Sequence, residues 1–97
     1  MRTSDTDISI TAHQCAMARS FLGWSQAALS RVAGLPVRTV RDFESGISDP
    51  AAAELAMLRY ALEEGGIVFT AGPGGVEGIR LRRPDEPVSR PAHMSLH

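Results

Sequence analysis

The fold is decided by the stretch LGWSQAALSRVAGLPVRTVRDFESG, which occupies residues 22–46. Its first half predicts a short helix over residues 26–32. Ser25 stands immediately before this segment, and serine is a preferred N-cap because its hydroxyl accepts a hydrogen bond from a free helical N–H. Gly34 stands just after it, at the place where a left-handed residue usually ends a helix. The stretch therefore begins with a helix that ends in a tight turn.

The second half of the stretch predicts another helix over residues 37–45. Pro36 suits its first turn, because the N–H that proline lacks would have no partner there. Gly46 ends the helix. Val40 and Phe43 stand three residues apart, so their apolar side chains fall on one face and fix the angle to the preceding helix. The two helices thus form a closely joined pair.

Two further helices flank this pair. Thr11 and Gln14 have the spacing of a capping box, which predicts a helix that begins at residue 11 and ends before the motif. Asp49 as N-cap, followed by Pro50, predicts the start of a fourth helix that ends at residues 65–66. The apolar side chains of this last helix recur at helical spacing at Leu55, Leu58 and Leu62.

Beyond residue 66 the apolar period changes from helix to strand. Residues 67–70 and 78–82 predict two strands joined by a glycine-rich loop. The predicted fold class is mainly α, a domain of four to five helices with a short C-terminal β-hairpin or strand pair. The chain is expected to divide into a polar N-terminal arm at 1–10, a helical domain at 11–64, strands at 67–83 and a disordered tail at 84–97.

Composition excludes several classes of protein. The chain has 97 residues, 43% of them hydrophobic, which suffices for one compact core. No run approaches the about 20 apolar residues that span a membrane, and the polar start is no signal peptide, so we expect a cytoplasmic location. The chain contains no lysine, which rules out a Walker-type phosphate loop and Schiff-base catalysis. We expect no enzyme activity, no cofactor and no metal site.

The helix pair resembles the repressor-like helix-turn-helix proteins typified by phage repressors and Cro, the XRE family. The resemblance covers about residues 11–64. Ser30 departs from the family pattern, in which alanine is more common. The resemblance implies a sequence-specific transcriptional regulator, a repressor, that reads the major groove of double-stranded DNA with the helix Val37–Ser45. It is carried by the joint spacing of Gln26, Leu29, Gly34, Val40, Phe43, Glu44 and Gly46.

The resemblance also implies which side chains contact DNA. Arg38 is the best candidate for a bidentate contact to guanine, and Val37 for contact with a thymine methyl group. Asp42 either accepts from a cytosine amino group or orients an arginine. Gln26, at the start of its helix, corresponds to a family glutamine that binds a phosphate. The full set of DNA-binding candidates is Ser25, Gln26, Val37, Arg38, Thr39, Arg41 and Asp42.

Three residues are expected to have structural roles. In the family, an arginine on the first helix pairs with the glutamate that ends the reading helix, and Arg19 and Glu44 match these positions. The resemblance therefore implies a partly buried salt bridge between them. Cys15 lies on the predicted apolar face of the first helix, and a buried cysteine usually behaves as an inert small hydrophobe.

The charge balance argues against strong DNA binding by this domain alone. Residues 11–64 contain five arginines and six acidic residues, whereas phosphate neutralisation dominates non-specific affinity. We therefore expect a homodimer, joined through residues 67–83, that reads two half-sites; the alternative is that these strands merely cover the fourth helix. A second function stays open, a protein-interaction module of the same fold, such as an antitoxin-like or regulator-binding subunit with a protein partner.

Overall fold

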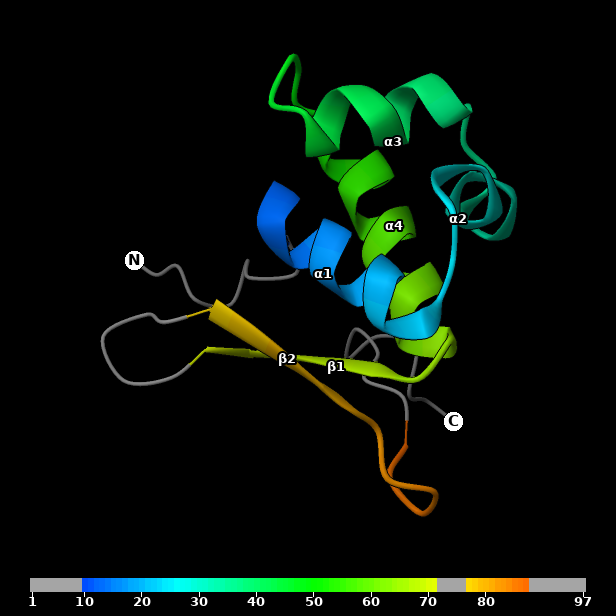
Figure 1. Cartoon of the computed structure of the whole chain (residues 1–97), viewed down its shortest axis with the longest axis vertical. Helices are drawn as coiled ribbons and strands as arrows, with labels where there is room; N and C mark the ends of the chain where they lie inside the picture. The colour runs from blue at the N-terminus through cyan, green and yellow to red at the C-terminus, as the bar shows by residue number, and fades with distance from the viewer. Residues whose placement is uncertain (1–9, 72–76, 88–97) are drawn as a thin grey trace.

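The computed structural model describes residues 10–71 and 77–87. In Figure 1, α3 lies at one end of the molecule, the two strands lie at the other, and α1 and α4 fill the space between them. The predicted fold class, mainly helical with a C-terminal strand pair, is confirmed. The elements in chain order are α1 (Ala12–Leu22), α2 (Gln26–Ala33), α3 (Val37–Glu44), α4 (Ala52–Glu64), β1 (Ile67–Ala71) and β2 (Glu77–Leu81).

The helix ends follow from local hydrogen bonding. Thr11 and Gln14 form the expected capping box, with the side chain of each accepting a hydrogen bond from the backbone N–H of the other at 3.0 and 3.1 Å. The Ser25 hydroxyl accepts from the N–H of Ala28 at 3.0 Å. Gly34 ends α2 in the left-handed region, at φ 75°, where a residue with a Cβ would be strained.

The start predicted for the fourth helix is wrong by two residues. Asp49 does not cap this helix; Ala51 is the N-cap and α4 begins at Ala52. The Glu54 carboxylate accepts a hydrogen bond from the N–H of Ala51 at 3.0 Å. An acidic side chain in the first turn therefore satisfies the backbone donor and suits the positive end of the helix dipole. The Asp49-Pro50 pair belongs to the loop before the helix.

The core joins all four helices. Leu29 of α2 and Val40 of α3 are fully buried, and Phe43 is 5% exposed, so the predicted apolar wedge between these helices is present. Leu58 and Leu62 of α4 are also fully buried. Burial of apolar side chains of this size is the main stabilising contribution in a small domain, and here it fixes the position of α3.

Ser30 and Gly65 are small residues whose places follow from packing. The Ser30 hydroxyl donates to the carbonyl of Ala27 at 2.8 Å, so the departure from the family's alanine leaves no unsatisfied polar group. Trp24 packs at the corner between α1 and α2. A Cβ at Gly65 would come within 2.8 Å of its ring, which explains why a glycine follows α4.

The hairpin is part of the core. Its strands pair antiparallel with Phe69 opposite Ile79, and both side chains pack with the buried Ile67 against the helices. The guanidinium of Arg59 in α4 lies 5.5 Å from the centre of the Phe69 ring, a cation–π contact. The hairpin contacts α1 as well as α4. It therefore closes the end of the helical domain opposite α3 (Figure 1).

Most of the predicted arm and tail lies outside the described residues. Of the arm the structure describes Ile10, which is 4% exposed and belongs to the core. Of the tail it describes residues 84–87, which form a turn against the hairpin. No helix in the described part of the chain is long and apolar enough to span a membrane.

Leu29→Ala should destabilise the domain by about 2–5 kcal/mol, because it removes buried methyl groups and leaves a cavity. The free energy of unfolding from urea titration measures the change. Val32→Ala is the matched control: it lies on the same helix but is 55% exposed, so its effect should stay within about 0.5 kcal/mol. Equal effects of the two substitutions would contradict the packing described above.

Candidate nucleic-acid interface

Helix α3 has one packed face and one open face. Val40 and Phe43 point into the core, whereas Val37, Arg38 and Arg41 are exposed, Val37 by 43% of its surface. In Figure 1 no other described element covers the outer side of α3. The helix is therefore a rigid rod at the surface, supported from beneath by apolar contacts and open to a macromolecular ligand.

The carboxylate of Glu44, at the end of α3, joins three helices. Arg19 of α1 donates to it from Nε to Oε2 at 3.0 Å and from Nη2 to Oε1 at 2.8 Å. Gln26 of α2 donates from Nε2 to Oε1 at 3.0 Å. The thiol of Cys15 in α1 donates to Oε2 at 3.3 Å. Arg19 also donates to the carbonyl of Trp24 at 2.9 Å, so the network extends into the connection between α1 and α2.

These contacts determine the protonation states of Glu44 and Cys15. Burial would raise the pKa of Glu44, but the hydrogen bonds from Arg19, Gln26 and Cys15 outweigh it and hold the pKa below its ordinary value. The stabilisation from this network is therefore fully present above the ordinary carboxyl pKa and is lost as the pH falls through the lowered value. Burial, with the neighbouring carboxylate of Glu44, raises the pKa of the Cys15 thiol well above its usual range. Cys15 therefore stays protonated and is no nucleophile.

The phosphate candidates lie at the start of α2. Ser25 uses its hydroxyl to cap the helix. The N–H groups of Gln26 and Ala27 follow it in the first turn, where backbone N–H groups have no partner within the helix and favour an anion. The Gln26 amide carries two N–H donors, and Glu44 accepts from this nitrogen. One N–H donor therefore remains for a phosphate, and Glu44 fixes its orientation.

The candidate residues on α3 differ in whether they form hydrogen bonds or ion pairs within the protein. Within residues 10–71 and 77–87, the arginine side chains without a hydrogen bond or ion pair are Arg31 and Arg38. Arg41 lies beside Asp42, with 3.5 Å between Nε and Oδ1. Thr39 is half-buried, and its N–H donates to the carbonyl of Pro36 at 3.0 Å. Arg38 thus presents its whole guanidinium to solvent.

Sequence reasoning missed two members of the Glu44 network. Gln26 was expected to face a phosphate and Cys15 to be an inert core residue, but both also donate to Glu44. They are 18 and 29 residues away from it in sequence, so no local spacing indicates the contact. One signal could have suggested these contacts. Cys15 and Gln26 lie on helix faces that both point toward the predicted salt bridge of Arg19 and Glu44.

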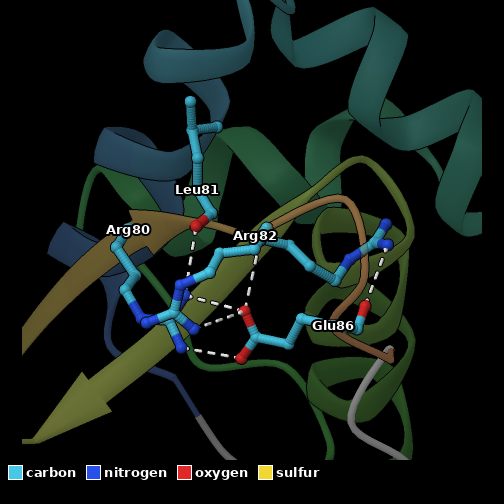
Figure 2. Close-up of polar contacts among 5 residues, drawn as sticks. Arg80, Leu81, Arg82 and Glu86 are labelled. Carbon is cyan, nitrogen blue, oxygen red and sulfur yellow. Dashed lines mark hydrogen bonds and ion pairs between the residues drawn. The ribbon is translucent and has the colours of Figure 1, made fainter.

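The hairpin arginines are not part of this interface. Arg80, Arg82 and Arg83 lie at the end of the molecule opposite α3 (Figure 1). They gather instead around the side chain and backbone of Glu86. Figure 2 shows this cluster at close range. These arginines therefore cannot add to the positive charge of the surface that α3 presents.

Comparison with known proteins identifies the motif. Residues 22–63 match a family model described as helix-turn-helix. The match begins at the end of α1 and covers α2, the turn, α3 and nearly all of α4. The resemblance to the XRE family inferred from the sequence is confirmed by this match. No curated protein matches the chain.

The Arg19–Glu44 pair predicts strong coupling in a double-mutant cycle. Arg19→Ala or Glu44→Ala alone should each cost about 3–5 kcal/mol, because each leaves a charge without its partner in a site where the side chains are 18% and 6% exposed. The double variant should cost much less than the sum. The free energy of unfolding is the measurement.

The control cycle uses Arg41→Ala and Asp42→Ala. This pair is longer, 3.5 Å, and Arg41 is 55% exposed, so its coupling should not exceed about 1 kcal/mol. Coupling near zero for Arg19 with Glu44 would refute the structural role given to the pair.

Proposed function

We propose that this protein, whose residues 22–63 match a helix-turn-helix family model, is a sequence-specific DNA-binding transcriptional regulator of the cytoplasm that acts as a repressor. Helix-turn-helix domains of this family bind DNA as regulators, and repression is the role that the resemblance to phage repressors suggests. The observation that carries the proposal is the open face of α3, on which Val37, Arg38 and Arg41 are exposed while the opposite face is buried.

Each candidate side chain has a proposed role in the major groove. The free guanidinium of Arg38 matches the two acceptors of guanine, and the exposed Val37 suits a thymine methyl group. Arg41 contacts either a base or the DNA backbone, and Asp42 orients its guanidinium. Phosphates on either side of the groove are held by the start of α2 and the first turn of α3, through Ser25, Gln26 and Thr39.

The charge on this interface is small, which favours action by two copies. Arg19 is paired with Glu44 and Arg41 lies beside Asp42, so little free positive charge besides Arg38 remains on α3. One copy reads only a few base pairs. Two copies on half-sites about 34 Å apart would multiply both affinity and selectivity. The molecule measures 33 Å across its longest axes, a size compatible with that separation.

We place the dimer contact on the face formed by α1 and β2. A shallow groove of about 540 Å³ lies there, lined mainly by α1 and by Ile79. Phe21 is 56% exposed and Leu81 54% exposed, and large exposed apolar side chains often mark contact sites. A two-fold axis through this face would leave both copies of α3 free. The outer edge of β2 could also pair across that axis.

A protein-interaction role is the second candidate. The balance of five arginines against six acidic residues in 11–64 favours it, because a dedicated DNA binder usually has a basic surplus. In that case the open face of α3 or the α1–β2 groove would bind a protein, as in an antitoxin-like or regulator-binding subunit. The two functions differ in one property, since only DNA binding requires affinity that falls steeply with salt.

Arg38→Ala should relax specificity at one base position by about 1–3 kcal/mol, whereas Gln26→Ala should weaken all sites alike. Selection of bound sequences from a random duplex library, followed by binding titrations at several salt concentrations, measures both. Arg31→Ala is the matched control, because it removes the other unpaired arginine and changes the charge equally; it should leave base preference unchanged. Failure of the unaltered protein to bind any duplex at low salt would favour the protein-interaction role.

Phe21→Glu and Leu81→Glu should each convert the dimer to a monomer in sedimentation velocity, since a charge would be buried at the contact. Val32→Glu is the control, because Val32 is equally exposed, at 55%, on another face. Point changes are preferable to deletion of residues 67–83, which carry part of the core. A dimer that survives both substitutions would exclude this face.

A further inference from the structure

The C-terminal end of the hairpin contains a carboxylate held by two arginines. Arg80 donates to Glu86 from Nη1 to Oε1 at 2.9 Å and from Nη2 to Oε2 at 2.7 Å, a two-pronged contact. The backbone N–H of Arg83 donates to Oε1 at 3.2 Å, and its guanidinium lies 3.7 Å from the same oxygen. Figure 2 shows the carboxylate of Glu86 facing the guanidinium of Arg80. A guanidinium group and a backbone N–H placed in this way bind a carboxylate or a phosphate.

The scaffold of this site does not depend on the Glu86 side chain. The backbone N–H of Glu86 donates to the carbonyl of Arg83 at 3.0 Å, which closes a turn with Pro84 in its second position, where proline is favoured. Arg80 and Arg82 are held by their places at the end of β2 and just after it; the Arg82 N–H donates to the carbonyl of Gly66 at 2.6 Å. The turn returns the Glu86 carboxylate to the arginines that precede it.

The arginines have donor capacity that Glu86 does not use. The guanidinium of Arg82 points away from the carboxylate and reaches the backbone carbonyl of Glu86 at 3.5 Å (Figure 2), so Arg80 and Arg83 are the arginines that face the Glu86 side chain. Arg83 is 68% exposed. A phosphate group in DNA has two charged oxygens, as a carboxylate has, but it also has neighbouring phosphates along the strand. The cluster therefore suits a polyanion better than the carboxylate that it holds.

We infer that Arg80 and Arg83 form a second phosphate-binding surface, which Glu86 occupies as an internal carboxylate until a phosphate of DNA displaces it. Guanidinium groups bind carboxylate and phosphate with the same two-pronged geometry. The pair of Arg80 and Glu86 is open to solvent, with side chains 39% and 23% exposed, and exposed ion pairs are weak. A strand of phosphates can therefore open the contact.

Competition by an anion, rather than by a proton, is the means of release. The hydrogen bonds from Arg80, with help from the N–H of Arg83, lower the pKa of Glu86 to about 2. The carboxylate is therefore charged throughout the neutral range. It stays in place unless another anion takes its donors.

The position of this surface determines which DNA it contacts. It lies at the end of the molecule opposite α3 (Figure 1), so the segment it holds differs from the one read by α3. Two segments could thereby be held by one protein. The assignment of DNA as the ligand rests on the proposed function, because that function already brings DNA to the protein. The existence of an anion site at Arg80 and Arg83 does not rest on it.

The test compares Glu86→Gln with Asp85→Asn. Both remove one negative charge from the same turn, but Asp85 is exposed and has no hydrogen bond or ion pair to the hairpin arginines, so only Glu86→Gln frees the site. Affinity for a random-sequence duplex is measured over a range of salt concentrations. Glu86→Gln should bind several-fold more tightly than Asp85→Asn at low salt. Its plot of log affinity against log salt should be steeper by about 1–2, one unit for each added phosphate contact.

Two further variants separate the possible failures. Adding Arg80→Gln to Glu86→Gln should return the affinity to that of Asp85→Asn. In a background of Arg38→Ala and Arg41→Ala the gain from Glu86→Gln should persist, even if α3 proves not to bind DNA. Equal affinity and slope for Glu86→Gln and Asp85→Asn would overturn the inference. Loss of the gain in the altered α3 background would overturn the claim of a separate surface.

Discussion

The carboxylate of Glu44 is the contact on which the arrangement of the helices depends. It ends α3 and accepts hydrogen bonds from Arg19, Cys15 and Gln26, so it fixes α3 to α1 and α2 at once. Apolar packing by Val40 and Phe43 presses α3 against the core but leaves its rotation about its own axis less defined. A charged, two-pronged hydrogen bond adds the missing direction. The apolar packing and the hydrogen bonds of Glu44 together determine where the outward residues of α3 lie.

The same network shows how the protein uses its few cations. In the described part of the chain most arginines are engaged within the molecule, at Glu44, Asp42, Glu63 or Glu86. A surface with little free charge binds phosphates weakly. The hairpin arginines lie at the far end, where the Glu86 carboxylate accepts hydrogen bonds from Arg80 and Arg83. The proposed action of two copies would compensate for weak binding by one copy.

The helices were predictable from sequence because their signals are local. Caps such as Ser25 and glycines such as Gly34 act within one turn, and the apolar spacing of α2 and α3 was sufficient to place them. The start of α4 was misplaced, because Asp49-Pro50 is a strong signal that a first-turn glutamate, Glu54, outcompetes. Contacts between residues far apart left no local signal, and the pair of Arg19 and Glu44 was expected only from the family resemblance. Nothing near Gln26 in the sequence reveals that its amide meets Glu44.

The central claim is that the open face of α3 contacts DNA. Chemical-shift mapping of the isotopically labelled protein, titrated with a duplex at low salt, tests it most directly. The account predicts that the signals of Val37, Arg38 and Arg41 move together with those of Gln26 at the start of α2. Unchanged signals on α3, with shifts confined to the α1–β2 groove or absent throughout, would contradict it.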